Sequence, residues 1–464
     1  MTDSPSDVLV FFGATGDLAY KKIFPALQAM IKRGTLDIPV IGVAKAGWGL
    51  EQLQARAADS LKQHGGIDMA AFGKLKELLR YIDGDYADAN TFAALKKAIG
   101  SAQRPAHYLA IPPALFGAVV KHLSEAGCAS AGARVVVEKP FGRDLASARA
   151  LNRTLLEIFD ETHIFRIDHY LGKGPVHNML FYRFTNPMHE AIWSRDHIES
   201  IQITMAEDFG VQGRGAFYDQ VGTIRDVIQN HLFQVLSNLA MEPPPRSDSE
   251  SMRDEKVKVL KSIPALEAGD VVRGQFRGYR EEPGVARDSQ VETFARLKLA
   301  VNSWRWQGVP FFIRAGKSLP VTCTEVVARL RKPPHVLYGG PRSNYLRFRI
   351  SPVSEIAFGL NVMDPEEAGT GDTVELLASR HAGANERDAY ERVLRDAMEG
   401  DRTLFAREDY VEEAWRIVEP VLGASTPLSI YEPGTWGPPG IEQVIPPGGW
   451  SDPANSQAHA GAAG

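Results

Sequence analysis

The chain has 464 residues, of which 44% are hydrophobic and 23% charged, so we expect an ordinary globular protein with two large domains. Its formal net charge of -5 argues against a nucleic-acid-binding or membrane-surface protein, and no segment approaches the roughly 20 apolar residues that cross a bilayer. Cys128 and Cys323 form neither a disulfide framework nor a zinc site, and no basic segment precedes an apolar run at the amino terminus, so the sequence predicts a cytoplasmic protein.

Strand and helix alternate over the first part of the chain. Residues 8–12 form a short continuous apolar run, which is typical of a strand buried in a parallel sheet. The further predicted strands are 39–44, 106–110, 134–137 and 163–167, and the predicted helices are 20–32, 50–64, 68–80, 91–99 and 144–159. This alternation favours a doubly wound α/β sheet, so we predict a Rossmann-like dinucleotide-binding domain over residues 1–170.

After about residue 170 the pattern changes to half-buried segments in which apolar and polar residues alternate. The strands predicted from this pattern are 200–205, 292–298, 311–314, 325–330 and 345–350. Such alternation indicates a mainly antiparallel sheet with one covered face, and we expect helices 224–240, 386–399 and 408–418 to cover it. The sequence therefore predicts a larger α+β domain over residues 171–448 and a flexible tail over 449–464.

The glycines that follow the first strand are the best candidate for a phosphate-binding loop. In Gly13-x-x-Gly16-x-x-Ala19, the first glycine permits a tight turn and the second lets backbone N–H groups approach a pyrophosphate at a helix amino terminus. The spacing differs from the commoner G-x-G-x-x-G, and a glycine-rich turn without a ligand is the alternative. The candidate cofactor-binding residues are Gly13, Ala14, Thr15, Gly16, Asp17 and Leu18.

The end of the second strand indicates which dinucleotide binds. A carboxylate there would bind a ribose 2′-hydroxyl, whereas a cation would accept a 2′-phosphate. The chain has Lys45 and no carboxylate until Glu51, so NADP is favoured. Because lysine lacks the two-pronged donor of arginine, NAD remains a weaker alternative, and a solvated surface lysine is the other interpretation.

His231 is the candidate general base. It lies on the apolar stripe of the predicted helix 224–240, where a lone histidine is usually a core residue. Asp226 and Asn230 share this helix, however, and Asp168 supplies another carboxylate elsewhere in the chain. A neutral imidazole accepts a proton best when an acceptor holds its other nitrogen, so both carboxylates are candidates for that role.

Residues 168–173 combine a carboxylate, an imidazole, a phenol and an ammonium. In an extended segment Asp168 and His169 point to opposite faces. We therefore expect Asp168 to serve the catalytic imidazole, and His169 to join Lys173 on an anion, with Tyr170 as a further donor and Gly172 as a bend. An ordinary Asp–Lys pair on a surface loop is the alternative.

Two further lysines end apolar strands. Lys139 follows the run 135–137, and Pro140 forces the chain to turn out of the sheet. Ligands bind at the carboxyl ends of parallel strands, so Lys139 is a candidate for the crevice. Lys317 similarly follows the strand that contains Arg314.

Taken together, these segments resemble the glucose-6-phosphate dehydrogenase family. The matching motifs are Gly13–Ala19, Glu138–Gly142, Arg166–Lys173, Ile224–His231 and Arg253–Val259. The likeness runs in order from about residue 8 to residue 432, and it includes residues 388–392 and 413–417.

The resemblance implies oxidation of glucose 6-phosphate at C1 to 6-phosphogluconolactone with hydride transfer to NADP, a step of the pentose phosphate pathway. It implies that His231 takes the C1 hydroxyl proton, that Asp168 stabilises the imidazolium, and that Lys139 touches both sugar and nicotinamide. The substrate-binding residues implied are Lys139, His169, Tyr170, Lys173, Glu207, Asp226 and Lys317. A homodimer through the sheet of the second domain, or a dimer of dimers, is also implied, and no metal is.

The chain departs from the family's pattern at three places. Lys45 stands where arginine is usual, the segment 318–323 lacks further basic residues, and Gly174-Pro175 replaces a commonly acidic position. The second departure puts in doubt another phosphate contact, and it weakens the case for the additional structural NADP site of some animal members. The alternative that these departures leave open is a catalytically weak, NADP-binding redox regulator of the same fold.

Overall fold

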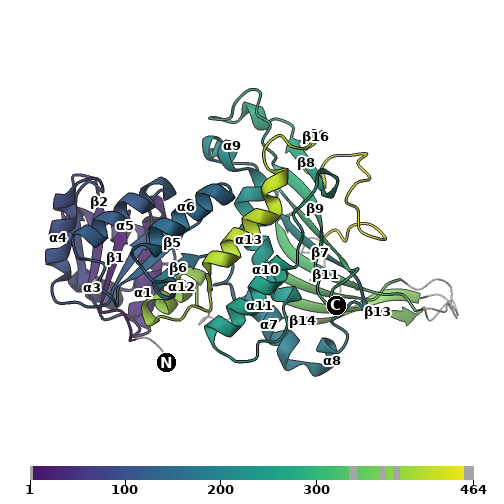
Figure 1. Cartoon of the computed structure of the whole chain (residues 1–464), viewed down its shortest axis with the longest axis horizontal. Helices are drawn as coiled ribbons and strands as arrows, with labels where there is room; N and C mark the ends of the chain where they lie inside the picture. The colour runs from purple at the N-terminus through teal and green to yellow at the C-terminus, as the bar shows by residue number, and fades with distance from the viewer. Residues whose placement is uncertain (1–3, 334–341, 365–370, 380–386, 454–464) are drawn as a thin grey trace. The chain divides into compact units, whose positions relative to one another are not determined.

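The computed structural model describes residues 4–333, 342–364, 371–379 and 387–453 (Figure 1). The chain divides into two compact units. The first comprises Met1–Lys173, Pro244–Asp254 and Arg387–Glu412, and the second comprises Gly174–Pro243, Glu255–Glu386 and Glu413–Gly464. The first unit therefore includes two later segments that the sequence analysis placed in the second domain.

The described residues of the first unit form a seven-stranded sheet in the order β15-β6-β5-β4-β1-β2-β3. The strands are β1 (Val8–Phe12), β2 (Val40–Ala44), β3 (Leu79–Asp83), β4 (Pro105–Leu109), β5 (Arg134–Glu138), β6 (Ile164–Ile167) and β15 (Phe405–Ala406). All neighbours pair in parallel except β15, which is antiparallel to β6. This arrangement confirms the predicted Rossmann-like fold.

Helices alternate with these strands. They are the π-helical η1 (Ala19–Ile23), then α1 (Phe24–Lys32), α2 (Leu50–Gln63), α3 (Met69–Leu78), α4 (Ala89–Ile99), α5 (Phe116–Glu125), α6 (Leu145–Leu156) and α12 (Ala389–Glu399), with short 3-10 turns η2 (Pro113–Leu115) and η3 (Glu161–His163). Asp68, Asp88 and Asp144 begin α3, α4 and α6 by accepting backbone N–H groups of the first turn. The predicted helix 68–80 was wrong at its end, because residues 79–83 form the edge strand β3, whose mixed burial lacks the continuous apolar run of a central strand.

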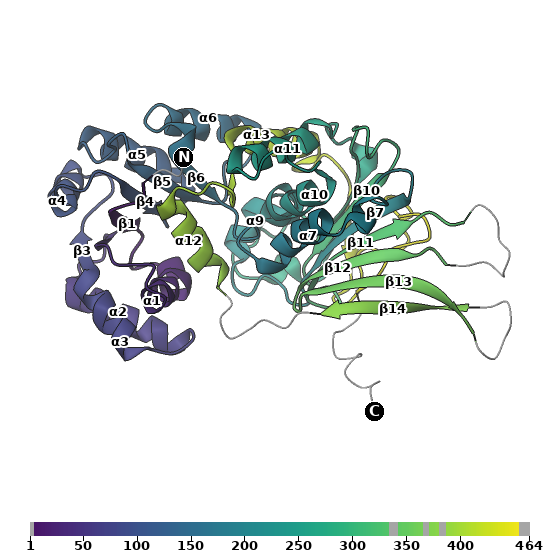
Figure 2. The ribbon, with the colours of Figure 1, turned by 90° about the horizontal axis from the view of Figure 1, so that it is seen from below.

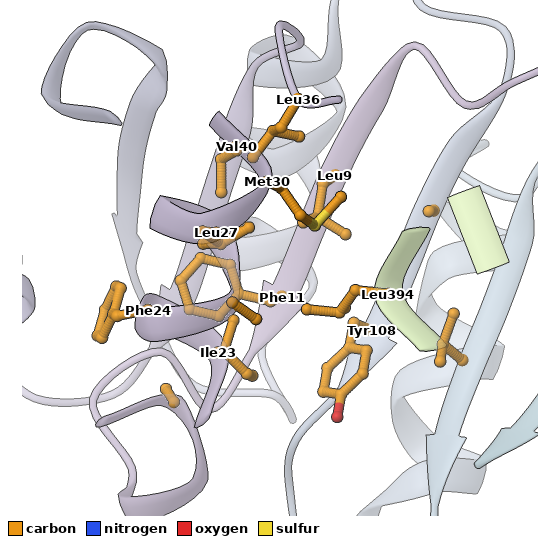
Figure 3. Packing of buried hydrophobic residues seen from close by; sticks show 14 of the residues in the cluster. Leu9, Phe11, Ile23, Phe24, Leu27, Met30, Leu36, Val40, Tyr108 and Leu394 are labelled. Carbon is orange, nitrogen blue, oxygen red and sulfur yellow. The ribbon is translucent and has the colours of Figure 1, made fainter. Parts of the chain in front are cut away.

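The core between the sheet and α1 shows why the late segment belongs to the first unit. Phe11 of β1 meets Phe24 of α1 edge to face, with ring centroids 5.9 Å apart. Figure 3 shows Leu394 of α12 beside this same group of side chains. Arg33, which follows α1, pairs with Glu391 of α12 at 2.9 Å. The prediction that helix 386–399 covers the second sheet is therefore wrong, since an amphipathic pattern does not identify the sheet that a helix covers.

The second unit contains a nine-stranded sheet in the order β14-β13-β12-β11-β7-β10-β9-β8-β16, counted over the described residues. The strands are β7 (Ile198–Ala206), β8 (Val271–Phe276), β9 (Phe294–Ala300), β10 (Pro310–Gly316), β11 (Cys323–Leu330), β12 (Tyr345–Ser351), β13 (Glu355–Met363), β14 (Gly371–Ser379) and β16 (Leu428–Tyr431). The pairs β7–β10 and β8–β16 are parallel and the others antiparallel. The prediction of an α+β domain with a mainly antiparallel sheet is confirmed.

The remaining helical elements are α7 (Gly174–Thr185), α8 (Pro187–Glu190), α9 (Gly215–Thr223), the π-helical η4 (Ile224–Leu232), α10 (Phe233–Ala240), α11 (Ser249–Lys261) and α13 (Glu408–Val418), with 3-10 turns η5 (Ala268–Asp270), η6 (Tyr279–Glu281) and η7 (Glu419–Val421). Helix α10 packs on α7, and α7 packs on β12 (Figure 2). The π-helical η4 directly precedes α10 and packs on β10. The predicted helix 224–240 is thus a π-helical segment continued by α10. In the described parts of the chain, no helix has the length and apolar character that a membrane crossing needs.

The segment 436–452, which we call the C-terminal strap, lies on the second sheet. The Arg314 guanidinium of β10 lies over the rings of Trp436 and Trp450, at 4.1 and 4.5 Å from their centroids. Arg314 is 1% exposed, and its Nη1 contacts Oδ1 of Asp452 at 2.7 Å. Residues 449–452, which the sequence predicts to be part of a flexible tail, thus include contacts to Arg314 of the second sheet, and residues 454–464 lie outside the described residues.

Removing the strap's carboxylate should destabilise the second unit. Burial lowers the pKa of Arg314 to about 10, so this guanidinium depends on its carboxylate partner. Because Asp452 itself is half exposed, we expect Asp452→Asn to lower the free energy of unfolding by about 1–2 kcal/mol. Differential scanning calorimetry measures the change as a lower Tm. The control is Glu432→Gln, which removes the exposed pair with Arg277; equal Tm values for the two variants would contradict the strap's role.

Candidate functional site

The loop after β1 has the geometry that a dinucleotide-binding turn needs. Gly13 has φ of 80°, and a Cβ there would lie 2.1 Å from the carbonyl oxygen of Ala110, so only glycine fits. The N–H of Gly16 donates to the Gly13 carbonyl at 2.9 Å and closes the turn. The loop residues 13–18 then lead directly into η1, and a helical amino terminus at this place suits a pyrophosphate.

Lys45 follows β2 directly, and carboxylates stand beside it. Its Nζ contacts Oδ2 of Asp85 at 2.7 Å, and the side chain is 71% exposed. Asp83 lies opposite Ala44 in the pairing of β2 with β3. No carboxylate stands between Lys45 and Glu51 in the sequence, and the carboxylates of the segment 83–85 come near Lys45 only because β3 pairs with β2.

Lys139 follows the last residue of β5, and a cis peptide bond joins it to Pro140. The preceding Glu138 accepts a hydrogen bond from the Tyr108 hydroxyl. Desolvation raises the pKa of Glu138 to about 7, and the nearby Asp168 carboxylate adds to this shift, whereas Tyr108 and Lys139 oppose it. The end of β5 therefore carries an ammonium next to a carboxyl group that changes its charge near neutral pH.

Residues 168–173 form consecutive turns, so the expectation of an extended segment is wrong. The N–H groups of Leu171, Gly172 and Lys173 donate to the carbonyl groups three residues earlier, at 2.9–3.1 Å. The Asp168 carboxylate accepts the N–H of Tyr170 at 3.0 Å. Successive side chains therefore do not alternate between two faces here, because these local hydrogen bonds curl the chain.

The same turns group the predicted anion-binding side chains. The Lys173 ammonium lies 3.6 Å from the centroid of the Tyr170 ring, and the His169 ring stacks beside Tyr390 at 6.4 Å. Gly172 packs so closely on α12 that a Cβ would lie 2.8 Å from the carbonyl oxygen of Ala389. Gly172 therefore permits a close approach, in addition to the bend that the sequence suggested.

Tyr390 is a candidate residue that the sequence analysis did not single out. It lies in the first turn of α12, and desolvation, followed by the charges of Glu138, Asp388 and Asp168, raises the pKa of its phenol. It stays protonated at neutral pH and can donate a hydrogen bond beside His169. Tyr390 lies in the matching motif 388–392, which could have identified it as a candidate. The motif gave no indication that α12 belongs to the first unit.

In the second unit His231 lies on η4 and is 2% exposed. π-helical turns within helices occur frequently at functional sites. The N–H of His231 is held by Oδ1 of Asn230 at 2.7 Å, and Nδ2 of Asn230 donates to the carbonyl of Arg225 at 2.9 Å. The segment that carries the candidate base thus has its own local hydrogen bonds.

Glu207 and Lys317 come together at the ends of two parallel strands. Glu207 follows β7 and Lys317 follows β10, which pair so that Ala206 lies opposite Gly316. The Lys317 ammonium donates to the Glu207 carboxylate, and it also lies over the ring of Tyr218 at 5.4 Å. These two predicted sugar-binding residues therefore form one polar cluster.

Asp226 belongs to the same neighbourhood of the second unit. Burial raises the pKa of Tyr218, and the charges of Asp226 and Glu207 raise it further. Tyr218 is buried and shares a hydrogen bond of 2.8 Å with Thr223. Tyr218 carried no spacing signal in the sequence, so reasoning from motifs did not find it.

The Glu138 carboxyl generates a prediction about stability and pH. Its pKa in the folded protein, about 7, exceeds its ordinary value of 4.5, so its contribution to stability is fully present below pH 4.5 and is lost as pH rises through 7. Glu138→Gln removes this loss and keeps an oxygen that can accept the Tyr108 hydroxyl. The Tm of the variant minus that of the unmodified protein should therefore increase from pH 5 to pH 8. The corresponding change in the free energy of unfolding is up to about 3 kcal/mol.

The matched control for this measurement is Glu157→Gln, on the exposed end of α6. Its Tm difference from the unmodified protein should not change with pH. A Glu138→Gln difference that is equally flat across this range would show that the carboxyl titrates at its ordinary pKa.

Nearly the whole chain is similar to known proteins. Residues 10–178 match the family model "Glucose-6-phosphate dehydrogenase, NAD binding domain", and residues 180–450 match "Glucose-6-phosphate dehydrogenase, C-terminal domain". The chain is 42% identical over 457 residues to glucose-6-phosphate 1-dehydrogenase 1 of Mycobacterium tuberculosis, with 97% of each chain covered.

Two solved structures are also similar over nearly the full length. The crystal structure of glucose-6-phosphate 1-dehydrogenase from Mycobacterium avium is 43% identical, with a TM-score of 0.91 and coverage of 98% of this chain and 100% of that one. A glucose-6-phosphate dehydrogenase in complex with its substrate glucose-6-phosphate is 35% identical, with a TM-score of 0.88 and coverage of 95% and 97%.

Proposed function

The chain belongs to the glucose-6-phosphate dehydrogenase family, and we propose on that premise how its residues oxidise glucose 6-phosphate at C1 with NADP. The reaction removes a proton from the C1 hydroxyl and a hydride from C1, and it leaves 6-phosphogluconolactone. The observation that best supports the assignment is that acid–base, phosphate-binding and nucleotide-binding residue types all follow the ends of parallel strands or lie on the π-helical segment.

The first unit holds the cofactor in this proposal. The turn 13–18 and the amino terminus of η1 bind the pyrophosphate, and Lys45 binds the 2′-phosphate. Lys139, at the end of β5, contacts both the nicotinamide and the sugar. When bound, NADP supplies the acceptor for the hydride.

His231 acts as the general base for the C1 hydroxyl proton. Its imidazole is almost fully buried, and a neutral imidazole nitrogen can accept a proton. The buried Asp168 carboxylate is the group that we assign to stabilising the imidazolium after proton transfer. These roles rest on the matching motifs around each residue, 166–173 and 224–231.

The remaining candidates bind glucose 6-phosphate. His169, Tyr170 and Lys173 bind the phosphate, because they gather an imidazole, a phenol and an ammonium on one set of turns, with Tyr390 as an additional donor. Lys317 and the carboxylates of the second unit, Glu207 and Asp226, bind the sugar hydroxyls. Each carboxylate can accept two hydroxyl hydrogen bonds, which selects among epimers.

Replacing the base tests this assignment. His231→Asn should lower kcat by about a hundredfold or more, while the dissociation constant for glucose 6-phosphate changes by less than about threefold, since a general base acts mainly in the transition state. Absorbance of reduced nicotinamide gives kcat with NADP and with NAD, and calorimetry gives substrate affinity.

The control for this experiment is His197→Asn, which changes an exposed histidine of the second unit and should keep full activity. An unchanged kcat in His231→Asn would remove the base assignment. If the unmodified protein shows no turnover with either cofactor, the redox-regulator alternative would be favoured.

The second unit is also the proposed site of dimerisation, in a homodimer or a dimer of dimers. Strand β14 is the edge of its sheet and exposes apolar side chains, with Leu376 61% and Met363 of the adjacent β13 69% exposed. An exposed apolar edge strand offers unpaired backbone groups and apolar surface to another chain. The buried, free thiols Cys128 and Cys323 support our proposal that the protein works in the reducing cytoplasm.

A charge on this strand should weaken the dimer. Leu376→Asp places a carboxylate in the proposed apolar interface, so the protein should sediment as a monomer at concentrations where the unmodified protein sediments as a dimer. Analytical ultracentrifugation measures the mass. The control Leu115→Asp alters an exposed apolar residue of the first unit, and the same mass for all three proteins would contradict the interface.

A further inference from the structure

The loop that follows β3 lies beside the end of β2. The two strands pair in parallel, with Ala44 opposite Asp83, so residues 83–86 and 44–48 leave the sheet at the same edge. The N–H of Gly84 donates to the carbonyl of Ala44 at 3.0 Å. Ligands bind at this carboxyl edge in open α/β sheets, which places the β3 loop next to the proposed site of the 2′-phosphate.

Asp83, the first acid of this loop, shapes the backbone. Its Oδ1 accepts the N–H groups of Ala46 and Gly47 at 2.9 and 2.8 Å, and the Tyr81 hydroxyl also donates to it. These hydrogen bonds lower the pKa of Asp83. Asp83 therefore stabilises the turn after Lys45, because its carboxylate accepts backbone N–H groups of that turn.

Asp85, the second acid, binds the lysine. Its Oδ2 contacts Nζ of Lys45 at 2.7 Å, while its Oδ1 accepts the N–H of Ala87 at 2.9 Å. The nearby Arg56 guanidinium instead lies over the rings of Tyr20 and Trp48. The cation assigned to the 2′-phosphate thus already has an anionic partner within the protein.

The Asp85 backbone is anchored on both sides of the ion pair. Its carbonyl accepts the hydroxyl of Thr91 at 2.8 Å. The next residue, Tyr86, donates its hydroxyl to the carbonyl of Val43 at 3.1 Å and accepts the N–H of Gly13 at 2.9 Å. The loop that presents Asp85 is therefore fastened to β2, to α4 and to the glycine turn.

We propose that Asp85 is a specificity-determining residue for the dinucleotide, which competes with a 2′-phosphate for Lys45. A 2′-phosphate must displace the Asp85 carboxylate from the ammonium and then lie near a like charge, which is unfavourable. A ribose 2′-hydroxyl carries no charge and can donate to the same carboxylate. Asp85 thus weakens NADP binding and favours NAD, so it reduces the preference for NADP over NAD that Lys45 provides. This inference rests on the proposed role of Lys45.

The test measures binding of each dinucleotide to the full-length protein without the sugar. Asp85→Asn removes the charge and keeps an oxygen that can accept the Ala87 N–H. It should tighten NADP binding by about threefold to fivefold and leave NAD binding equal or weaker, so that the NADP-to-NAD affinity ratio rises. Isothermal titration calorimetry gives both dissociation constants, and Asp85→Ser is the second variant if the asparagine protein does not fold.

Asp37→Asn is the matched control. Asp37 forms a similar aspartate–lysine pair with Lys74 at 2.8 Å and precedes β2, at the opposite end of that strand. This variant should leave both affinities unchanged. A ratio in Asp85→Asn that stays equal to the control would overturn the inference.

Lys45→Ala separates the two levels of the argument. If it weakens NADP more than NAD while Asp85→Asn leaves the ratio unchanged, the role of Lys45 stands and that of Asp85 falls. If Lys45→Ala weakens both dinucleotides equally, the 2′-phosphate role of Lys45 fails, and the competition proposed for Asp85 fails with it.

Discussion

Parallel pairing of strands is the constraint on which the candidate site depends. Parallel neighbours end at the same edge of a sheet, so a residue that follows one strand lies near residues that follow the next. In the first unit the residues that directly follow β1, β2, β5 and β6 are Gly13, Lys45, Lys139 and Asp168. The second unit repeats the arrangement on a smaller scale, because β7 and β10 are a parallel pair within a mainly antiparallel sheet, and Glu207 and Lys317 follow them.

The central strands and the motifs of this edge could be predicted from the sequence. A strand buried on both faces reads as a continuous apolar run, as in 8–12 and 134–137, and the residues that follow such runs are easy to identify. The edge strand β3 has no such run, so the sequence did not predict this strand, its carboxylate or the pairing of Lys45 with Asp85. Periodicity identified the helix 386–399 but not the sheet on which it packs.

Local hydrogen bonding explains the other differences between sequence and structure. The side chains of Asp168 and His169 would point to opposite faces only in an extended backbone. In the structure, successive hydrogen bonds between residues three apart curl the segment 168–173. Tyr218 and Tyr390 join their clusters through contacts between distant segments, and a single tyrosine has no spacing that predicts such contacts. The segment 449–453 consists of small and polar residues apart from Trp450, and it contacts the buried Arg314 of the sheet through the Trp450 ring and the Asp452 carboxylate.

The interrupted composition of the first unit bears on how the protein can be made. Leu394 and Phe405 belong to the core that also contains Leu9 and Phe11, although most of the second unit is synthesised between these two pairs of residues. A nascent chain that ends at residue 386 therefore still lacks part of this core, so the nucleotide-binding unit cannot finish folding on the ribosome before most of the message has been translated. For the same reason, a protein truncated after residue 170 would have a Rossmann-like sheet whose apolar surface is left partly uncovered.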